Sequence, residues 1–198
     1  MAYGTFRSVA EVAKKFDISV IQGKPFIKRK KLEIPDLLFS VIEDDLSDAT
    51  NYVSEYAICD ALIRPILSVV ARNYTLKVWS HVAYNVDEKK GLIGEPDYLI
   101  APLTKYGEMA RPALCIIEAK NDNFDKGWTQ VLAEMVASSL LGATTCYGIV
   151  STGRLWQFGK FENYTFITDA NFISATDNLQ HVFDTVNWVF DDISKTYE

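Results

Sequence analysis

The order of the expected elements predicts an α/β fold, in which helices and strands alternate through the middle of the chain. Helically spaced apolar residues run from Tyr52 to Val70, and three short apolar runs follow them. A second helical segment and a fourth apolar run come next. Apolar residues three or four apart are typical of helices packed on one face, whereas short apolar runs between turn residues are typical of buried strands.

Size and composition favour a globular protein of one domain, residues 1–198, large enough to bury a substantial core. No apolar run approaches the ~20 residues that span a bilayer. The first residues show no secretory pattern, because Lys14 and Lys15 follow a short amphipathic segment. We therefore expect a cytoplasmic protein without a membrane partner. The net charge of −6 argues against strong non-specific binding of nucleic acid over the whole surface, although a local basic groove is compatible with it.

The cysteines and histidines do not suggest a zinc site or a disulfide framework. Three cysteines lie far apart in apolar runs, which is typical of reduced, buried thiols. His81 and His181 are too few and too distant in sequence to indicate zinc by their spacing.

The first 35 residues are expected to hold a short helix and an extended segment. Ser8 to Glu11 has the form of a capping box, so a helix should run from there towards Lys15. Residues 18–35 read as extended and contain the basic run Lys28-Arg29-Lys30-Lys31. This run is either a phosphate-contacting patch beside Phe26 or a solvated edge protected by charge.

A long helix should follow, capped at Ser47 or Asp48, with Pro65 kinking it or ending its first half. Three strands are then expected at 76–82, 93–101 and 113–119. A second helix should span 128–141, with Gly142 after it. Gln130 and Glu134 share a face of that helix that differs from its apolar stripe.

The last third of the chain is expected to form a hairpin and a helix. A buried strand at 147–150 turns at 151–154 into a second strand at 155–158. An amphipathic helix spans 179–193, and its apolar stripe is most simply core. Trp188 lies just off this stripe and suggests a subunit contact, so a homodimer is one expectation.

Charged residues stand at the ends of two expected strands. Gly94-Glu95-Pro96-Asp97 opens one apolar run, and Glu118-Ala119-Lys120 closes the next. Side chains alternate along a strand, so Glu118 and Lys120 point to the same side of the sheet. If the Asp97 strand pairs beside them, Asp97 and Glu118 can hold one divalent cation with Lys120 nearby, a site suited to phosphodiester hydrolysis. Otherwise Asp97 is a turn-forming acid and the other two form an ion pair.

This arrangement resembles the PD-(D/E)XK nuclease superfamily. The matching residues are Pro96-Asp97 and Glu118-Ala119-Lys120, with Glu55 on the first core helix. Residues 54–67 and the hairpin 151–158 look like the N-terminal nuclease domain of type I restriction enzyme motor subunits. Gln130 occupies the place of a glutamine motif in related members, but Glu134 replaces the aromatic residue that follows it there. The likeness covers about residues 47–160 and implies a restriction-endonuclease-like core, αβββαβ, with an added C-terminal helix.

The resemblance also implies roles for individual residues. Asp97, Glu118 and the backbone carbonyl of Ala119 would bind Mg²⁺ or Mn²⁺, and Glu55 would complete the set directly or through water. Lys120 would orient the attacking water or stabilise charge on the phosphoryl group. Gln130 would position the water or the phosphate. Glu95 shares a face with Asp97 and is a reserve ligand.

The expected function is that of a metal-dependent DNA endonuclease, related to restriction, repair or defence. The sequence contains no ATPase motor and no target-recognition module, so it would act alone, await restriction or defence subunits, or be a remnant. The alternative is a catalytically silent protein of the same fold that binds nucleic acid or protein. The complete charged set favours the enzyme, and the acidic net charge favours the silent protein.

Overall fold

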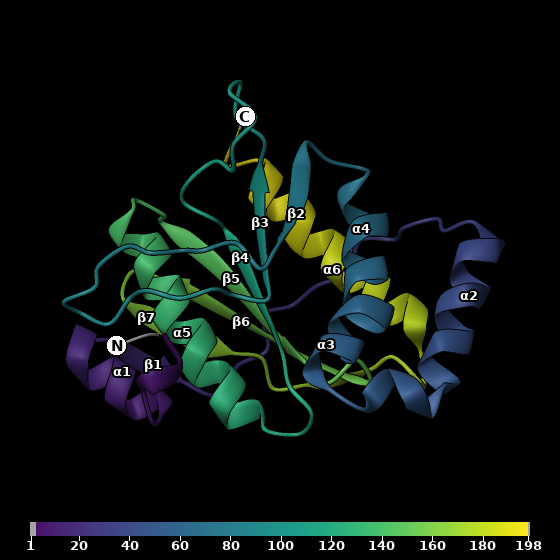
Figure 1. Cartoon of the computed structure of the whole chain (residues 1–198), viewed down its shortest axis with the longest axis horizontal. Coiled ribbons are helices and arrows are strands. Elements are labelled where there is room, and N and C mark those ends of the chain that lie inside the picture. The colour runs from purple at the N-terminus through teal and green to yellow at the C-terminus, as the bar shows by residue number, and fades with distance from the viewer. Residues whose placement is uncertain (1–2, 198) are drawn as a thin grey trace.

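The computed structural model describes residues 3–197 and confirms the predicted α/β class. A mixed, open sheet of eight strands carries helices on both faces (Figure 1). The strand order is β1-β7-β6-β5-β4-β3-β2, with β8 paired to β6. The strands are β1 (Ser19–Ile21), β2 (Leu76–Ser80), β3 (Tyr98–Pro102), β4 (Cys115–Ala119), β5 (Thr145–Ser151), β6 (Leu155–Glu162), β7 (Thr165–Thr168) and β8 (Ile173–Ser174).

The helices divide between the two faces of the sheet and build a hydrophobic core on each. One core lies under η1 (Tyr3–Thr5) and helices α1 and α5, and the other lies under α2, the run α3–η3–α4 and α6. The helices are α1 (Val9–Phe16), α2 (Asp36–Ser47), α3 (Glu55–Ile58), α4 (Arg64–Ala71), α5 (Phe124–Leu140) and α6 (Leu179–Ser194), with the 3₁₀ turn η2 (Ala49–Tyr52) and the π-helical turn η3 (Cys59–Ile63).

The central strands β3, β4 and β5 carry the candidate site residues at their ends. β3 pairs antiparallel with β4, and β4 pairs parallel with β5. A parallel pair needs a crossover connection, which α5 provides between β4 and β5. All residues of β4 are buried, as expected for a strand covered on both faces.

The expected long helix from residue 47 is wrong at its start. The side chain of Ser54, rather than that of Ser47 or Asp48, accepts a hydrogen bond from the amide of Ala57 and caps α3. Asp48 instead caps η2 by accepting from the amide of Thr50. The sequence prediction also missed α2, which begins directly after Pro35.

Pro65 does not end the helical run from Glu55 to Ala71. A π-helical turn lies directly before α4 begins. The amide of Arg64 bonds to the carbonyl of Cys59, five residues back. Pro65 then lies in the first turn of α4, where a missing N–H is tolerated. The run from Glu55 to Ala71 is therefore continuous, and Glu55 and Arg64 lie on the same helical segment.

The other predicted elements are present with shifted ends. β3 begins at Tyr98 rather than Ile93, so Asp97 lies immediately before the strand. α5 begins at Phe124, four residues early, because the side chain of Asn123 caps it. The helix from Ser8, the hairpin at 151–154 and the C-terminal helix agree with prediction. Strands β1, β7 and β8 were not predicted individually.

The cysteines of the chain carry free thiols. Cys59, Cys115 and Cys146 are buried and unbridged, as predicted. Within residues 3–197, no helix combines the length and apolar character needed to cross a bilayer.

Candidate functional site

The ends of β3 and β4 bring Asp97 beside Glu118. The register pairs Tyr98 with Ile117, so the residue before β3 lies opposite Glu118 near the end of β4. The amide of Ala119 donates to Asp97 Oδ2 at 2.8 Å, and the amide of Asp97 approaches Glu118 Oε1 at 3.3 Å. These two backbone contacts fix the carboxylates next to each other, as the strand pattern predicted.

Lys120 places its ammonium group among three oxygen atoms. Its Nζ lies 3.0 Å from Glu118 Oε2 and 2.7 Å from the carbonyl oxygen of Ala119. A third oxygen, Oε2 of Glu55, lies 3.6 Å away. Glu118 and Lys120 are only 2% and 3% exposed, so this contact is screened little by solvent. All three oxygens belong to residues that the resemblance assigns to a metal.

Glu55 reaches the site from helix α3, on the face of the sheet that α4 and α6 cover. It is the first residue of α3, immediately after the capping Ser54. Its side chain is 44% exposed, and its contact with the site is the ion pair to Lys120. It is the most exposed of the three carboxylates, so it is the one that solvent reaches most readily.

The electrostatics of the site disfavour two ionised carboxylates. Burial, and secondly the negative charge of Asp97, raise the pKa of Glu118 to about 7, although Lys120 lowers it. Burial also raises the pKa of Asp97, against the Ala119 hydrogen bond and the charge of Lys120. Burial alone lowers the pKa of Lys120, but Glu118 more than offsets this, so the pKa lies above its ordinary value. The cluster therefore holds more negative charge than one ammonium group neutralises.

Glu134 of α5 is a fourth acid at this site, although it was expected on a face of the helix away from the apolar stripe and was given no role. It is 1% exposed, and its Oε2 has no hydrogen-bond partner within the described chain. Burial, followed by the charges of Glu118 and Asp97, raises its pKa well above the ordinary value. The sequence indicated this burial only by placing the glutamate between two apolar residues, Ala133 and Met135, which are both buried.

His81 and Glu95 form a more exposed border of the site. Nδ1 of His81 lies 4.0 Å from Asp97 Oδ1 and 3.9 Å from Glu95 Oε1. The imidazole also packs against the rings of Tyr56 and Tyr98. Glu95 contacts His81 rather than the buried carboxylates, so the reserve ligand lies outside the central cluster. The role of His81 was missed, because it follows β2 and is distant in sequence from Asp97.

Gln130 lies on α5 but is not joined to the cluster by a hydrogen bond among residues 3–197. It lines a pocket of about 590 Å³ between α1 and the first turns of α5, together with Asn123 and Lys126. The residue of α5 that packs directly on Lys120 is Gly127: a Cβ there would lie 3.2 Å from Lys120 Cγ. The structure thus brings together Asp97, Glu118 and Lys120 with Glu55, whereas Gln130 faces the pocket beside α1.

The donor atoms fit a hard divalent cation in their chemistry. Carboxylate and carbonyl oxygens are the ligands that Mg²⁺ and Mn²⁺ prefer, and Asp97, Glu118 and Ala119 supply them. The unpartnered buried oxygen of Glu134 adds a further acceptor nearby. Within residues 3–197, no group of three or more His, Cys, Asp or Glu side chains is arranged as metal ligands. The fit therefore rests on a two-carboxylate pair and its neighbouring oxygens.

The basic run Lys28–Lys31 lies along α6 and is partly paired. Lys30 forms an ion pair with Asp191, and Lys31 forms one with Glu33. The backbone of the run is also tied to α6, since the amide of Lys30 donates to the carbonyl of Asp184. Lys28 and Arg29 are exposed. These contacts support a structural role for half of the run.

Comparison with protein-family models, with characterised proteins and with solved structures found no match. The interpretation of the site therefore depends on its own geometry and charges.

Proposed function

We propose that this protein hydrolyses phosphodiester bonds in DNA with a divalent cation bound at Asp97 and Glu118. The proposal includes a restriction-endonuclease-like core made of the run α3–α4, β2, β3, β4, α5 and β5. The observation that supports it best is the adjacency of the Asp97 and Glu118 carboxylates at the strand ends, with buried Glu134 nearby and one ammonium group among them. A buried excess of negative charge is costly for the fold alone and favourable for binding a cation.

Each residue has a defined task in this proposal. Asp97, Glu118 and the carbonyl of Ala119 hold the cation, and Glu55 approaches from the exposed side. When bound, the cation supplies positive charge at a phosphoryl oxygen and lowers the pKa of an attacking water. The ammonium group of Lys120 would lie beside the cation and stabilise negative charge that develops on the phosphoryl group. Burial strengthens these interactions, since solvent screens them little.

One observation favours the catalytically silent alternative. The ammonium group of Lys120 already contacts all three converging oxygens, so it satisfies part of the need for a cation. A protein of this kind would bind nucleic acid or protein without cleaving it.

The test is DNA cleavage by the purified protein with Mg²⁺ or Mn²⁺, on supercoiled, linear, branched and single-stranded substrates. Lys120→Ala is expected to lower the rate of cleavage at least 100-fold, because it removes a charge that acts on the reacting phosphoryl group. The matched control is Lys160→Ala. Lys160 also lies two residues from a glutamate, with Nζ 3.0 Å from Glu162 Oε2, but far from the buried carboxylates.

Cleavage that requires metal and Lys120 but not Lys160 supports the proposed enzyme. If the wild-type protein leaves every substrate intact with both metals, the proposal is wrong and the silent alternative replaces it. Equal activity of wild type and Lys120→Ala would also contradict the assigned site.

A further inference from the structure

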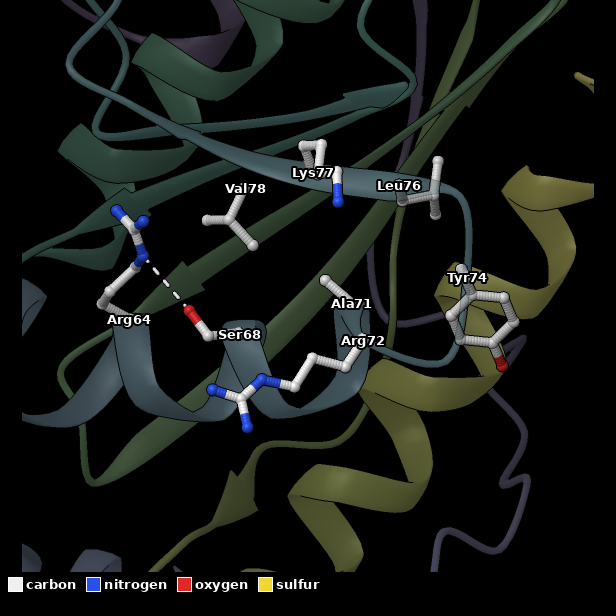
Figure 2. Close-up of a pocket in the computed structure, with 8 residues that line it drawn as sticks. All are labelled: Arg64, Ser68, Ala71, Arg72, Tyr74, Leu76, Lys77 and Val78. Carbon is white, nitrogen blue, oxygen red and sulfur yellow. Dashed lines mark hydrogen bonds between the residues drawn. The ribbon is translucent and has the colours of Figure 1, made fainter. Parts of the chain in front are cut away.

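A groove separate from the carboxylates lies between α4 and the edge strand β2 (Figure 2). Its volume is about 350 Å³. Arg64, Ser68 and Arg72 extend from α4, as Figure 2 shows, and Leu76, Lys77 and Val78 come from β2. The groove thus has an apolar floor, with Arg64 and Arg72 on its helical wall and Lys77 at its strand edge.

The helical side of the groove is a row of polar residues four apart. Arg64, Ser68 and Arg72 recur every four positions, so they share one face of α4. The two arginines are separated along the axis by about 12 Å, at ~1.5 Å per residue. Nε of Arg64 donates to Ser68 Oγ at 3.2 Å, which orients that guanidinium group. The two arginines therefore start from positions spread along the length of the groove.

The charge of the groove is opposite to that of the whole chain. The chain has 26 acidic and 20 basic residues, yet no acidic residue lines the groove. Within the described chain, none of Arg64, Arg72 and Lys77 forms an ion pair. Since clefts concentrate the field of the charges that line them, this groove attracts anions despite the acidic total.

Two carboxylates lie beyond the ends of the groove. Asp60 is exposed and precedes Arg64 by one helical turn, without forming an ion pair in residues 3–197. Asp191 lies near Tyr74 at the other end, but Lys30 and Lys195 both contact it. The far end therefore remains positive. Lys30 of the basic run also reaches this end, with its Nζ 5.6 Å from the centre of the Tyr74 ring.

The groove leads away from the candidate metal site. Strand β2 ends at Ser80, and the next residue is His81, which contacts Asp97. On the helical side, Glu55 precedes Arg64 by nine residues, an axial distance of about 13 Å. Arg64 is therefore closer to the site than Arg72, which is farther along the same helix. Phosphates of one strand of B-form DNA recur every ~3.4 Å along the axis, so the groove lies about four to seven nucleotides from the site.

We propose that this groove binds the phosphodiester backbone of a nucleic-acid strand that continues from the carboxylate site. This inference rests on the proposed function for the position of the strand. A row of cations along a helix and a strand fits a polyanion better than one small anion, because the backbone positions of Arg64 and Arg72 are about 12 Å apart along the helix axis. Guanidinium groups bind phosphate oxygens through two parallel hydrogen bonds, and Ser68 adds a hydroxyl donor.

The test uses the double variant Arg72→Gln/Lys77→Gln. Both residues are exposed, and Arg64 is left intact because of its bond to Ser68. The matched control is Lys14→Gln/Lys89→Gln, which removes two exposed cations on the opposite side, on α1 and in the loop that Lys15 contacts. Thermal melts establish that both variants are folded. Labelled single-stranded and duplex oligonucleotides are titrated in EDTA at several salt concentrations, so that binding is measured without cleavage.

The groove variant is expected to bind DNA about 10-fold more weakly at low salt, and the slope of log K against log salt should fall by ~1.4–1.8 for two lost phosphate contacts. The control should keep the affinity and slope of the wild type. A groove variant indistinguishable from the control overturns the proposal. Saturating inorganic phosphate or pyrophosphate that stabilises the wild type but not the groove variant, while DNA affinity is equal for both, would assign the groove to a small anion and also overturn it.

The same proteins are assayed for cleavage, which separates the two proposals. Loss of DNA affinity in the groove variant together with an inactive wild type supports the groove and rejects the enzyme. An active wild type whose affinity does not depend on Arg72 and Lys77 supports the enzyme and rejects the groove.

Discussion

At the scale of single residues, the chemistry of the site depends on how little positive charge the fold supplies. Lys120 contacts Glu118 and Glu55, and Asp97 lies beside them, bound to the amide of Ala119. Removal from water disfavours each ionised carboxyl, and their mutual repulsion adds to this effect. One ammonium group offsets only part of the cost. The pKa of Glu118 is therefore raised, whereas a simple ion pair would lower it.

This raised pKa predicts that Glu118→Gln stabilises the metal-free protein. The pKa of Glu118 is about 7 in the folded state and 4.5 in its ordinary environment. The protonated carboxyl of Glu118 therefore favours the folded state. This contribution to stability is complete below pH 4.5 and is lost as the pH rises through about 7. At pH 8 in EDTA we expect the glutamine variant to be more stable by ~1–3 kcal/mol, and at pH 4 to show no such gain. Urea unfolding at several pH values measures this.

The control for that substitution is Glu162→Gln. Glu162 is paired with Lys160 at the surface, and this hydrogen bond lowers its pKa. Its replacement should be neutral or slightly destabilising at pH 8, by ~0–1 kcal/mol. If Glu118→Gln lowers the free energy of unfolding at pH 8, Glu118 and Lys120 form a structural ion pair and the prediction is wrong.

Strand alternation was sufficient to predict that Glu118 and Lys120 share a face, and Asp97 was expected beside them if its strand paired with theirs, which β3 and β4 do. His81 and Glu134 could not be predicted in the same way. His81 reaches Asp97 only because β2 ends beside the start of β3, which depends on the register of two strands. The burial of Glu134 depends on how closely α5 lies on β4 and β5. The role of Gln130 was predicted from the resemblance alone, and within residues 3–197 no hydrogen bond joins it to the cluster.

At the scale of secondary-structure elements, the close approach of α5 to the sheet positions Lys120. Gly127 permits this approach, because a Cβ at that position would lie 2.6 Å from Val150 Cγ1 and 3.2 Å from Lys120 Cγ. Ser54 fixes the start of α3 and so places Glu55 at the site. The sequence showed the helical spacing of this run, but two possible caps and Pro65 left its start and its continuity undetermined.

Gly127→Ala is expected to destabilise the protein even though alanine is the better helix former. Alanine in an exposed helix adds up to ~1 kcal/mol of stability, whereas overpacking of a buried position costs ~1–3 kcal/mol. The contact with Val150 decides the sign. Lys126→Ala, at the neighbouring exposed position, serves as the control and should change stability by less than ~0.5 kcal/mol. A more stable Gly127→Ala protein in urea unfolding would show that α5 has room to move away from Lys120.

At the scale of the whole molecule, the carboxylate site and the basic groove lie along one path. The run α3–α4 carries Glu55 near one end and Arg72 after the other, and β2 follows it back towards His81. The basic run meets the far end of this path through Lys30, although its pair with Asp191 also stabilises the packing of α6. The acidic charge of the chain is therefore compatible with a local path for a polyanion. Composition alone could not reveal this, because it does not report where charges lie.

The central claim is that Asp97 and Glu118 bind one divalent cation, and thermal unfolding with and without Mn²⁺ tests it most directly. A cation that binds only the folded state stabilises it by ~2.7 kcal/mol at 100 times its dissociation constant. For a chain of this size we expect Tm to rise by ~5–10 °C over the value in EDTA. Asp97→Asn and Glu118→Gln should each abolish that rise, and Glu162→Gln should retain it. A wild-type Tm that is the same in EDTA and in Mn²⁺ would contradict the account.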